Sequence, residues 1–235
     1  MLTAIIVAGG SSRRMGFDKT FAPLHGRPVV AHTIAAFEAS AVVDEIILVG
    51  REERLAELKE MAAQQQFRKV QNVIAGGARR QDSVSAGLKE AHTDSRYIAV
   101  HDAARCLVKP GQIERVFACA RANGAAALAG AVVDTLKRAN ADGTISGSVD
   151  REGVFAMQTP QIFLRELLLE AYQRITKKKL LITDEVTAVQ NLGRKVMLVS
   201  HVDVNLKITY PTDLLLAEAV LAERRKEQAT HSTDR

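Results

Sequence analysis

The sequence has few aromatic residues and few cysteines, and each scarcity excludes a class of protein. Trp is absent and aromatic residues make up 4% of the 235 residues, so the core has to be built from Ala, Val, Leu and Ile. This composition favours helices that alternate with buried parallel strands, because such strands are aliphatic on both faces. Cys106 and Cys119 are too few for a disulfide scaffold and lack CxxC spacing, which fits a reducing compartment.

Long hydrophobic runs and concentrated basic patches are also missing. No stretch reaches the roughly 18 apolar residues that a membrane-spanning helix needs. The apolar run at residues 2–8 is short and follows no basic segment, which predicts a first strand and not a signal peptide. Lys plus Arg number 32 and Asp plus Glu 27, a net charge of +5 that favours anionic ligands. The basic runs contain no aromatic residues, so we expect no nucleic-acid partner. Because neither a signal peptide nor a membrane-spanning helix is predicted, we expect a cytoplasmic protein without a membrane partner.

Apolar runs alternate with segments of helical periodicity along most of the chain. The predicted strands cover residues 4–8, 46–49, 70–74, 97–100, 125–133 and 195–199, and the predicted helices begin near residues 28, 52, 82, 110, 164, 184 and 211. Residues 140–143 contain Asp-Gly between two short alternating segments, which predicts a hairpin. The expected fold class is α/β: a doubly wound, mostly parallel, Rossmann-like sheet with helices on both faces and an inserted β-arm.

The organisation expected from this pattern is one domain over residues 1–229. The β-arm at about residues 134–155 is too small to be a second domain, so we expect it to pack on a second subunit. The polar residues 230–235 predict a frayed tail.

Ligands of such sheets bind at the carboxyl ends of the strands, so the segments that follow the strands form the candidate site. The segment of residues 8–19 combines glycine and serine with Arg13, Arg14 and Lys19. Small residues let backbone N–H groups approach phosphate oxygens, and the cations add charge. The spacing is neither Walker A nor GxGxxG. The segment therefore indicates a phosphate-binding loop of another type, although taken alone it is also compatible with a structural surface turn.

Further polar motifs follow the later strands in a fixed order. They occupy residues 76–84, 100–105, 134–138, 158–161, 183–185 and 205–209. With the opening loop, the series resembles the 2-C-methyl-D-erythritol 4-phosphate cytidylyltransferase family of sugar-phosphate nucleotidyltransferases, over about residues 3–221. The resemblance implies an enzyme of the non-mevalonate isoprenoid precursor pathway. It would join CTP and 2-C-methyl-D-erythritol 4-phosphate to give 4-diphosphocytidyl-2-C-methyl-D-erythritol and pyrophosphate.

The implied reaction needs no side-chain nucleophile. The attacking phosphate monoester has a second pKa of about 6 and is largely dianionic at pH 7. The obstacle is the repulsion between two polyanions, which fixed cations and a divalent metal ion relieve. The sequence offers no convincing Ser-His or Cys-His arrangement, in agreement with this chemistry.

The resemblance assigns roles to the residues that match the family's motifs. The expected catalytic cations are Arg14, Lys19 and Lys207. The residues expected to bind the nucleotide are Ala8, Gly9, Gly10, Gly77, Arg80 and Ser83. Those expected to bind the alditol phosphate are Arg105, Asp134, Thr135, Arg151 and Thr183. Thr135 and Arg151 would serve the neighbouring subunit's site, which implies a homodimer with composite active sites.

Asp102 is the expected ligand of Mg²⁺ or another divalent cation. It directly follows an apolar strand, and a carboxylate oxygen suits such an ion. A helix-capping role is the alternative for Asp102, and Asp203 and Asn205 both remain open as a second metal ligand. We expect His101 to be a packed histidine at the end of a strand and not a general base.

Three other functions remain open on the sequence alone. One is the same transfer to another alditol phosphate, such as ribitol 5-phosphate, and another is a nucleotide-sensing protein without activity. The third is guanylyl transfer, because the Gly9-Gly10 pair also occurs in molybdopterin-cofactor guanylyltransferases, where this family often has Ala first. Ser12, Ala78 and Cys106 also depart from the family pattern, which affects loop shape and removes no phosphate ligand.

Overall fold

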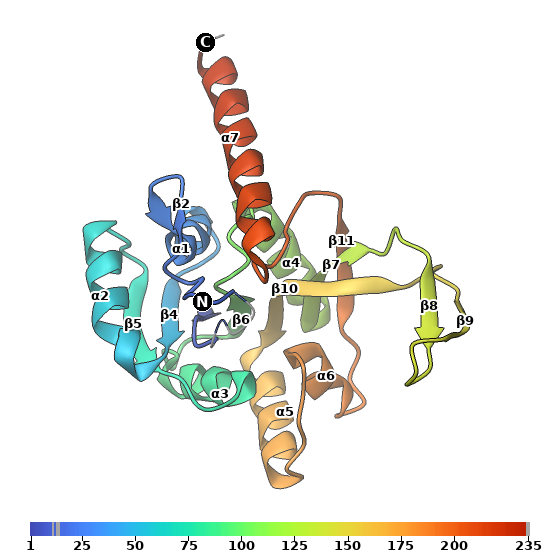
Figure 1. Cartoon of the computed structure of the whole chain (residues 1–235). Coiled ribbons are helices and arrows are strands. Elements are labelled where there is room, and N and C mark those ends of the chain that lie inside the picture. Colours follow the sequence, from blue (N-terminus) through green and yellow to red (C-terminus); the bar gives the residue numbers. More distant parts are fainter. Residues whose placement is uncertain (11, 13–14, 234–235) are drawn as a thin grey trace.

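A seven-stranded sheet forms the centre of the computed structural model, which describes residues 1–10, 12 and 15–233 (Figure 1). The strands are β1 (Leu2–Val7), β4 (Glu45–Gly50), β5 (Val70–Ala75), β6 (Tyr97–Asp102), β7 (Ala125–Ala131), β10 (Phe155–Leu164) and β11 (Met197–His201). They lie in the order β11-β7-β10-β6-β1-β4-β5. β10 is antiparallel to β6 and β7, and the other neighbouring pairs are parallel. The expected mostly parallel α/β sheet is confirmed.

Helices cover both faces of this sheet, as expected. One face carries α1 (Val29–Ala39), α2 (Leu55–Gln64) and α4 (Pro110–Asn123), and the other carries α3 (Arg80–Glu90), α5 (Arg165–Lys177) and α6 (Glu185–Gln190). A short 3-10 turn, η1 (Glu52–Arg54), precedes α2. Among the described residues, no helix combines the length and the apolar composition needed to cross a bilayer.

The last helix, α7 (Pro211–Thr233), stands out from the body of the molecule (Figure 1). The sequence pattern predicts its end near Gln228, but the helix continues to Thr233. It thereby enters the segment 230–235 that we expected to be a frayed polar tail.

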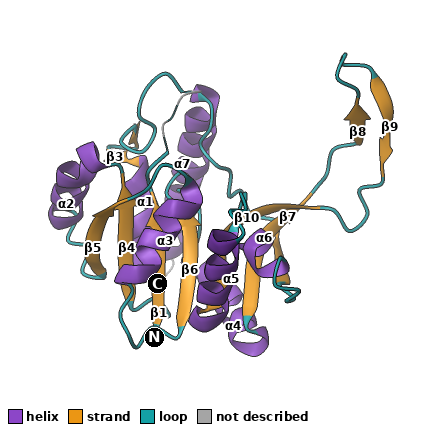
Figure 2. Ribbon diagram, turned by 90° about the horizontal axis from the view of Figure 1, so that it is seen from below, coloured by secondary structure: helices purple, strands orange, loops and turns teal. Residues whose placement is uncertain are grey.

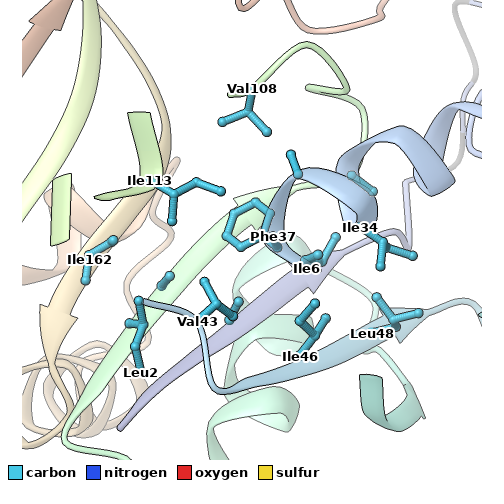
Figure 3. Packing of buried hydrophobic residues seen from close by; sticks show 14 of the residues in the cluster. Leu2, Ile6, Ile34, Phe37, Val43, Ile46, Leu48, Val108, Ile113 and Ile162 are labelled. Carbon is cyan, nitrogen blue, oxygen red and sulfur yellow. The ribbon is translucent and has the colours of Figure 1, made fainter. Parts of the chain in front are cut away.

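Alternate residues of the central strands enter two separate cores, one on each face of the sheet. Ile6 of β1 packs with Ile34 and Phe37 of α1 (Figure 3), whereas the neighbouring Ile5 packs with Val84 of α3. All five side chains are fully buried. Burial of a side chain of this size stabilises the fold by about 1.5–3 kcal/mol. The two-sided burial accounts for the aliphatic composition of the strands.

A glycine determines how closely α3 approaches the sheet. A Cβ atom on Gly87 would lie 2.6 Å from Cγ2 of Ile5, which is closer than real Cβ atoms come to a neighbour. α3 therefore lies directly on β1. Its first residue, Arg80, thereby comes to the carboxyl edge of the sheet, where it lines a cavity together with Val7 and Ala8.

Three strand pairings were not predicted from the sequence. The polar residues 158–161 lie within β10, which bonds to β6 and β7 and shifts register between Met157 and Gln161. Proline within a run argues against a central strand, yet Pro160 lies here, after a cis peptide bond, where the register shifts. A short hairpin of β2 (Pro23–Leu24) and β3 (Arg27–Pro28) precedes α1.

The arm predicted at about residues 134–155 leaves the sheet between β7 and β10. It contains the antiparallel strands β8 (Leu136–Ala139) and β9 (Ile145–Val149). Gly143 in their turn has φ +85°, a left-handed conformation that favours glycine. Figures 1 and 2 both show this hairpin standing away from the body. Its side chains are largely exposed, including 69% of Ile145.

Candidate active site

A cavity of about 630 Å³ opens at the carboxyl edge of the sheet, beside β1. β4 lies on one side of β1 and β6 on the other, so the strand order reverses there, which is where such sheets bind ligands. The predicted site residues that line this cavity are Ala8, Gly9, Gly10, Lys19, Gly77, Arg80, Ser83, Asp102 and Lys207. The structure thus brings together the predicted nucleotide-binding and catalytic residues that it describes. Arg14 lies outside the described residues.

A second cavity, of about 280 Å³, adjoins the first. Arg80, Asp102 and Lys207 line both cavities and form their common wall. Two of the predicted alditol-binding residues, Arg105 and Thr183, line the second cavity together with residues 157–159 of β10. Two ligands, one in each cavity, would therefore meet at the common wall.

Asp102 holds this common wall together. Its Oδ1 accepts a hydrogen bond from Nε of Arg80 at 2.8 Å, and its Oδ2 accepts one from Nζ of Lys207 at 2.7 Å. Burial acts to raise the pKa of Asp102, but the two cations outweigh it and hold that pKa well below its usual range. Asp102 is therefore a carboxylate at any pH near neutrality.

The larger cavity has an excess of positive charge. Its described walls contain the cations Lys19, Arg79, Arg80 and Lys207 against one carboxylate, that of Asp102. Nζ of Lys19 also donates to the carbonyl oxygen of Ile208 at 2.7 Å, which ties the first loop to the segment that carries Lys207. Such a cavity attracts polyanions such as a nucleoside triphosphate.

The turn after β5 packs tightly against the start of α3. A Cβ atom on Gly76 would lie 2.4 Å from Oγ of Ser83, so glycine is required there by close approach. The N–H of Gly77 donates to the same Oγ at 3.2 Å, and Oγ donates to the carbonyl of Arg79 at 3.3 Å. Ser83 thus shapes the turn that forms one wall of the cavity.

His101 is fully buried at the end of β6, with its ring centroid 4.9 Å from that of Phe37. Burial lowers the pKa of His101 to about 3, so the ring is neutral at pH 7. Its neighbours fit one tautomer, in which Nε2 donates to the carbonyl of Arg105 and Nδ1 accepts from the hydroxyl of Thr159. Oγ1 of Thr159 also accepts the N–H of Asp102. His101 is therefore a packed structural residue, as expected, that holds the backbone of Asp102.

The described residues fit a metal ion held by one carboxylate and by substrate phosphates. They contain no group of three or more His, Cys, Asp and Glu side chains placed to hold a metal. Asp203 instead pairs with Nζ of Lys109 at 2.6 Å, and Nδ2 of Asn205 donates to Gln158. Neither belongs to the described walls of the cavities, which leaves Asp102. Mg²⁺ is commonly bound by one or two carboxylates plus phosphates.

Three predicted substrate-binding residues lie apart from both cavities within one chain. Asp134 and Thr135 are exposed at the base of the arm, and Arg151 follows β9. The Arg151 guanidinium donates to the carbonyl of Val133 and lines a shallow cavity of about 410 Å³ there. A single chain therefore does not bring the arm residues to Asp102.

Sequence reasoning missed one charged residue behind the site. Glu185 is fully buried and bonds to Arg80. The only sequence signal for this residue is its place in the polar motif at residues 183–185. An acidic residue in the first turn of a helix is normally an exposed partner of the helix dipole, so the pattern does not predict its burial.

The family model of 2-C-methyl-D-erythritol 4-phosphate cytidylyltransferase matches residues 2–223. The chain belongs to this family. A relative of that name from Dehalococcoides mccartyi (strain CBDB1) is 40% identical over 223 residues, which cover 94% of this chain and 96% of that protein. Another from Pelotomaculum thermopropionicum is 39% identical over 95% of each chain. The resemblance drawn from the ordered motifs is thus confirmed.

Solved structures of cytidylyltransferases from this family share the fold. A 4-diphosphocytidyl-2C-methyl-D-erythritol synthase from Anaerococcus prevotii superposes with a TM-score of 0.83 at 27% identity, covering 94% of this chain and 96% of that one. The 2-C-methyl-D-erythritol 4-phosphate cytidylyltransferase from Thermus thermophilus gives 0.78 at 32% identity, covering 93% and 98%. The protein is therefore a nucleotidyltransferase with the α/β fold of the cytidylyltransferase family.

Proposed function

We propose that this cytidylyltransferase joins CTP and 2-C-methyl-D-erythritol 4-phosphate at the common wall of the two cavities. The products are 4-diphosphocytidyl-2-C-methyl-D-erythritol and pyrophosphate, in the non-mevalonate isoprenoid precursor pathway. Family membership supports the reaction. The observation that carries its assignment to this site is the wall of Arg80, Asp102 and Lys207, which faces both cavities.

CTP occupies the larger cavity in this proposal. Backbone groups of residues 8–10 contact the cytosine and ribose, and Gly77 and Ser83 complete the pocket. Lys19 holds the triphosphate from the first loop. Arg14 shares that role by the family resemblance alone. The excess of cations on the described walls supports a triphosphate as the occupant.

The transfer is one substitution at the α-phosphorus of CTP. An oxygen of the methylerythritol phosphate dianion forms a bond to that phosphorus. The bond from the phosphorus to the oxygen that bridges to the β-phosphate breaks, and its electron pair leaves with pyrophosphate. Lys207 and Arg80 offset the charge on the pentacoordinate transition state, and Lys19 offsets that on the leaving group. Partial burial strengthens these interactions relative to water.

Asp102 is the residue that would hold Mg²⁺ or another divalent cation. Each of its oxygens has one bond to a cation and keeps a second lone pair, and the lowered pKa keeps the group ionised. When bound, such an ion would neutralise charge on the substrate phosphates.

A second copy of the chain completes the site for the alditol phosphate. Arg105 and Thr183 line the smaller cavity, whereas Asp134, Thr135 and Arg151 belong to the arm. The position of the arm away from its own body supports an exchange of arms in a homodimer (Figure 2). Both cysteines are free thiols, which supports a cytoplasmic location.

Mass spectrometry of the products tests the proposal. The enzyme with Mg²⁺ is offered CTP with methylerythritol phosphate, CTP with ribitol 5-phosphate, and GTP with each alditol phosphate. We expect the CDP-linked alcohol and pyrophosphate from the first pair, and about 10²–10⁴-fold slower product formation from Lys207→Ala prepared in parallel. A preference for ribitol 5-phosphate, or turnover of GTP without CTP, would overturn the substrates. No turnover of any pair would favour a nucleotide-sensing protein.

A further inference from the structure

Glu185 is an acidic side chain that is completely buried and absent from the described walls of both cavities. Burial raises the pKa of Glu185, and Arg80 opposes that rise. It is the first residue of α6, and its N–H donates to Oε1 of Gln161 at 3.2 Å. Both carboxylate oxygens accept from Nη1 of Arg80, at 2.8 and 2.9 Å, and Oε1 also accepts from the hydroxyl of Tyr172 at 3.0 Å. Glutamate is almost never fully buried unless paired, so Arg80 explains why a carboxylate is tolerated here.

Arg80 connects this buried carboxylate to the active site. Its Nη1 bonds to Glu185 and its Nε bonds to Oδ1 of Asp102. A guanidinium is planar, so two nitrogens fixed by two different carboxylates leave it one orientation. The third nitrogen, Nη2, is buried and has no hydrogen-bond partner among the described residues. Arg80 lines both cavities, so its guanidinium belongs to the wall at which two ligands would meet.

We propose that Glu185 is a positioning residue for cytidylyl transfer, which with Tyr172 fixes the guanidinium of Arg80 so that Nη2 meets a phosphate oxygen between the two substrates. This inference rests on the proposed function, because the phosphate oxygen belongs to its substrates. Without Glu185, Arg80 would be held by Asp102 alone, and Asp102 is shared with Lys207. The guanidinium would then rotate about its single remaining ion pair.

The charges around Arg80 give the inference a distinctive signature. Burial acts to lower the pKa of Arg80, but Glu185 and Asp102 outweigh it and hold that pKa above its usual range. Glu185 and Asp102 thus offset the cations Arg80 and Lys207, and Nε of Arg105 adds a third cation 4.0 Å from Oδ2 of Asp102. Removal of the charge at position 185 leaves the wall more positive, which favours the binding of CTP. The same change releases Arg80, which slows the chemical step. Binding and turnover should therefore respond in opposite directions.

Glu185→Gln separates these two effects, because glutamine keeps the size of the side chain and one acceptor oxygen. We expect kcat to fall about tenfold, while the Kd for CTP measured by calorimetry tightens or stays within about twofold. Tyr172→Phe removes one hydrogen bond to Oε1 and should lower kcat about two- to threefold. In an Arg80→Ala background, Glu185→Gln should change kcat by less than about twofold, because Glu185 acts through Arg80. Circular dichroism checks the fold of each variant.

Val189→Ala is the matched structural control. Val189 lies on the same helix, is fully buried and packs in the hydrophobic core. The void left by this variant should lower the thermal midpoint and keep kcat within about twofold of the wild type. An unchanged kcat in Glu185→Gln, an equal loss in Val189→Ala, or a tenfold loss that persists without Arg80 would each overturn the positioning role.

Nuclear magnetic resonance tests whether Glu185 makes the Arg80 guanidinium rigid, and this measurement does not depend on enzyme activity. The Nε–H signal of Arg80 is assigned by its disappearance in Arg80→Lys, and its order parameter is measured in the wild type and in Glu185→Gln. We expect a rigid signal that becomes mobile when Glu185 loses its charge. Equal rigidity in both proteins overturns the positioning role, whatever the kinetics. Absence of wild-type turnover overturns the proposed function instead, and the order parameter still decides whether Glu185 fixes Arg80.

Discussion

Nζ of Lys207 lies 2.7 Å from Oδ2 of Asp102, although 105 positions separate the two residues in the sequence. Asp102 ends β6 near the centre of the sheet, whereas Lys207 follows the edge strand β11. The segment after β11 therefore passes over the carboxyl end of β7 and across the antiparallel strand β10 to reach Asp102. This contact creates the wall that both cavities share, which is where two phosphates would meet.

Loss of the Lys207 charge should mainly slow the chemical step. We expect Lys207→Ala to lower kcat about 10²–10⁴-fold, the loss typical of a group that stabilises developing charge. Pyrophosphate release at saturating CTP measures it. Lys177→Ala, at an exposed position on α5, is the control and should keep the wild-type rate. A Lys207→Ala enzyme within tenfold of the wild type would contradict the role.

Asp102→Asn should weaken the response to Mg²⁺. Asparagine keeps the shape of the side chain and removes the charge that Arg80 and Lys207 share. We expect half-maximal activity to require at least about tenfold more Mg²⁺, while CTP binding without metal, followed by calorimetry, changes less. The same Mg²⁺ titration in both proteins would show that Asp102 is no metal ligand.

Two inactive variants should restore each other if arms are exchanged between subunits. In a mixed dimer of Arg151→Ala and Lys19→Ala, one site carries both changes and the other carries neither. Half of the dimers are mixed after random exchange, so about one quarter of the wild-type activity should return. Lys19→Ala mixed with Lys207→Ala is the control, because both changes lie on the same body and no intact site forms. Equal inactivity of the two mixtures, with exchange demonstrated, would indicate a self-contained site.

His101 should make the protein less stable in mild acid. The folded-state pKa of about 3 lies below the value of about 6.5 in an unfolded chain, so the unfolded chain takes up the proton first as the pH falls. The contribution of His101 to the free energy of unfolding is thus complete above pH 6.5 and decreases below it. Between pH 8 and pH 5 the decrease is about 2 kcal/mol.

Urea unfolding at these two pH values measures the effect. The difference in unfolding free energy between the wild type and His101→Gln should be about 2 kcal/mol smaller at pH 5 than at pH 8. Parallel pH dependence of the two proteins would mean that His101 is charged in the folded state.

Most of the sheet and the central site could be predicted from the sequence, and the reason lies in the strands. Ile5 and Ile6 enter opposite cores, so a buried parallel strand leaves a continuous aliphatic run. The carboxyl ends of parallel strands share one edge, which places the segments with Gly77 and Asp102 around a single cavity.

Polar residues that are buried by tertiary contacts could not be predicted in this way. Thr159 and Gln161 of β10 are buried, and their side chains bond to His101 and Asp184, so this part of the strand has no aliphatic signature. The burial of Glu185 depends on Arg80, which is distant in the sequence. The arm residues are a different case, because their proposed partners belong to another chain.

The arm that carries Arg151 begins and ends at hydrogen-bonded neighbours, since β7 leads into it and β10 leads back. Both ends are thus fastened to the sheet independently of what lies between them. Insertions, deletions or redesign within residues 136–149 would not propagate to the phosphate-handling wall. In the proposed dimer, changes to these residues would alter subunit pairing and alcohol selectivity and leave the nucleotide cavity as it is.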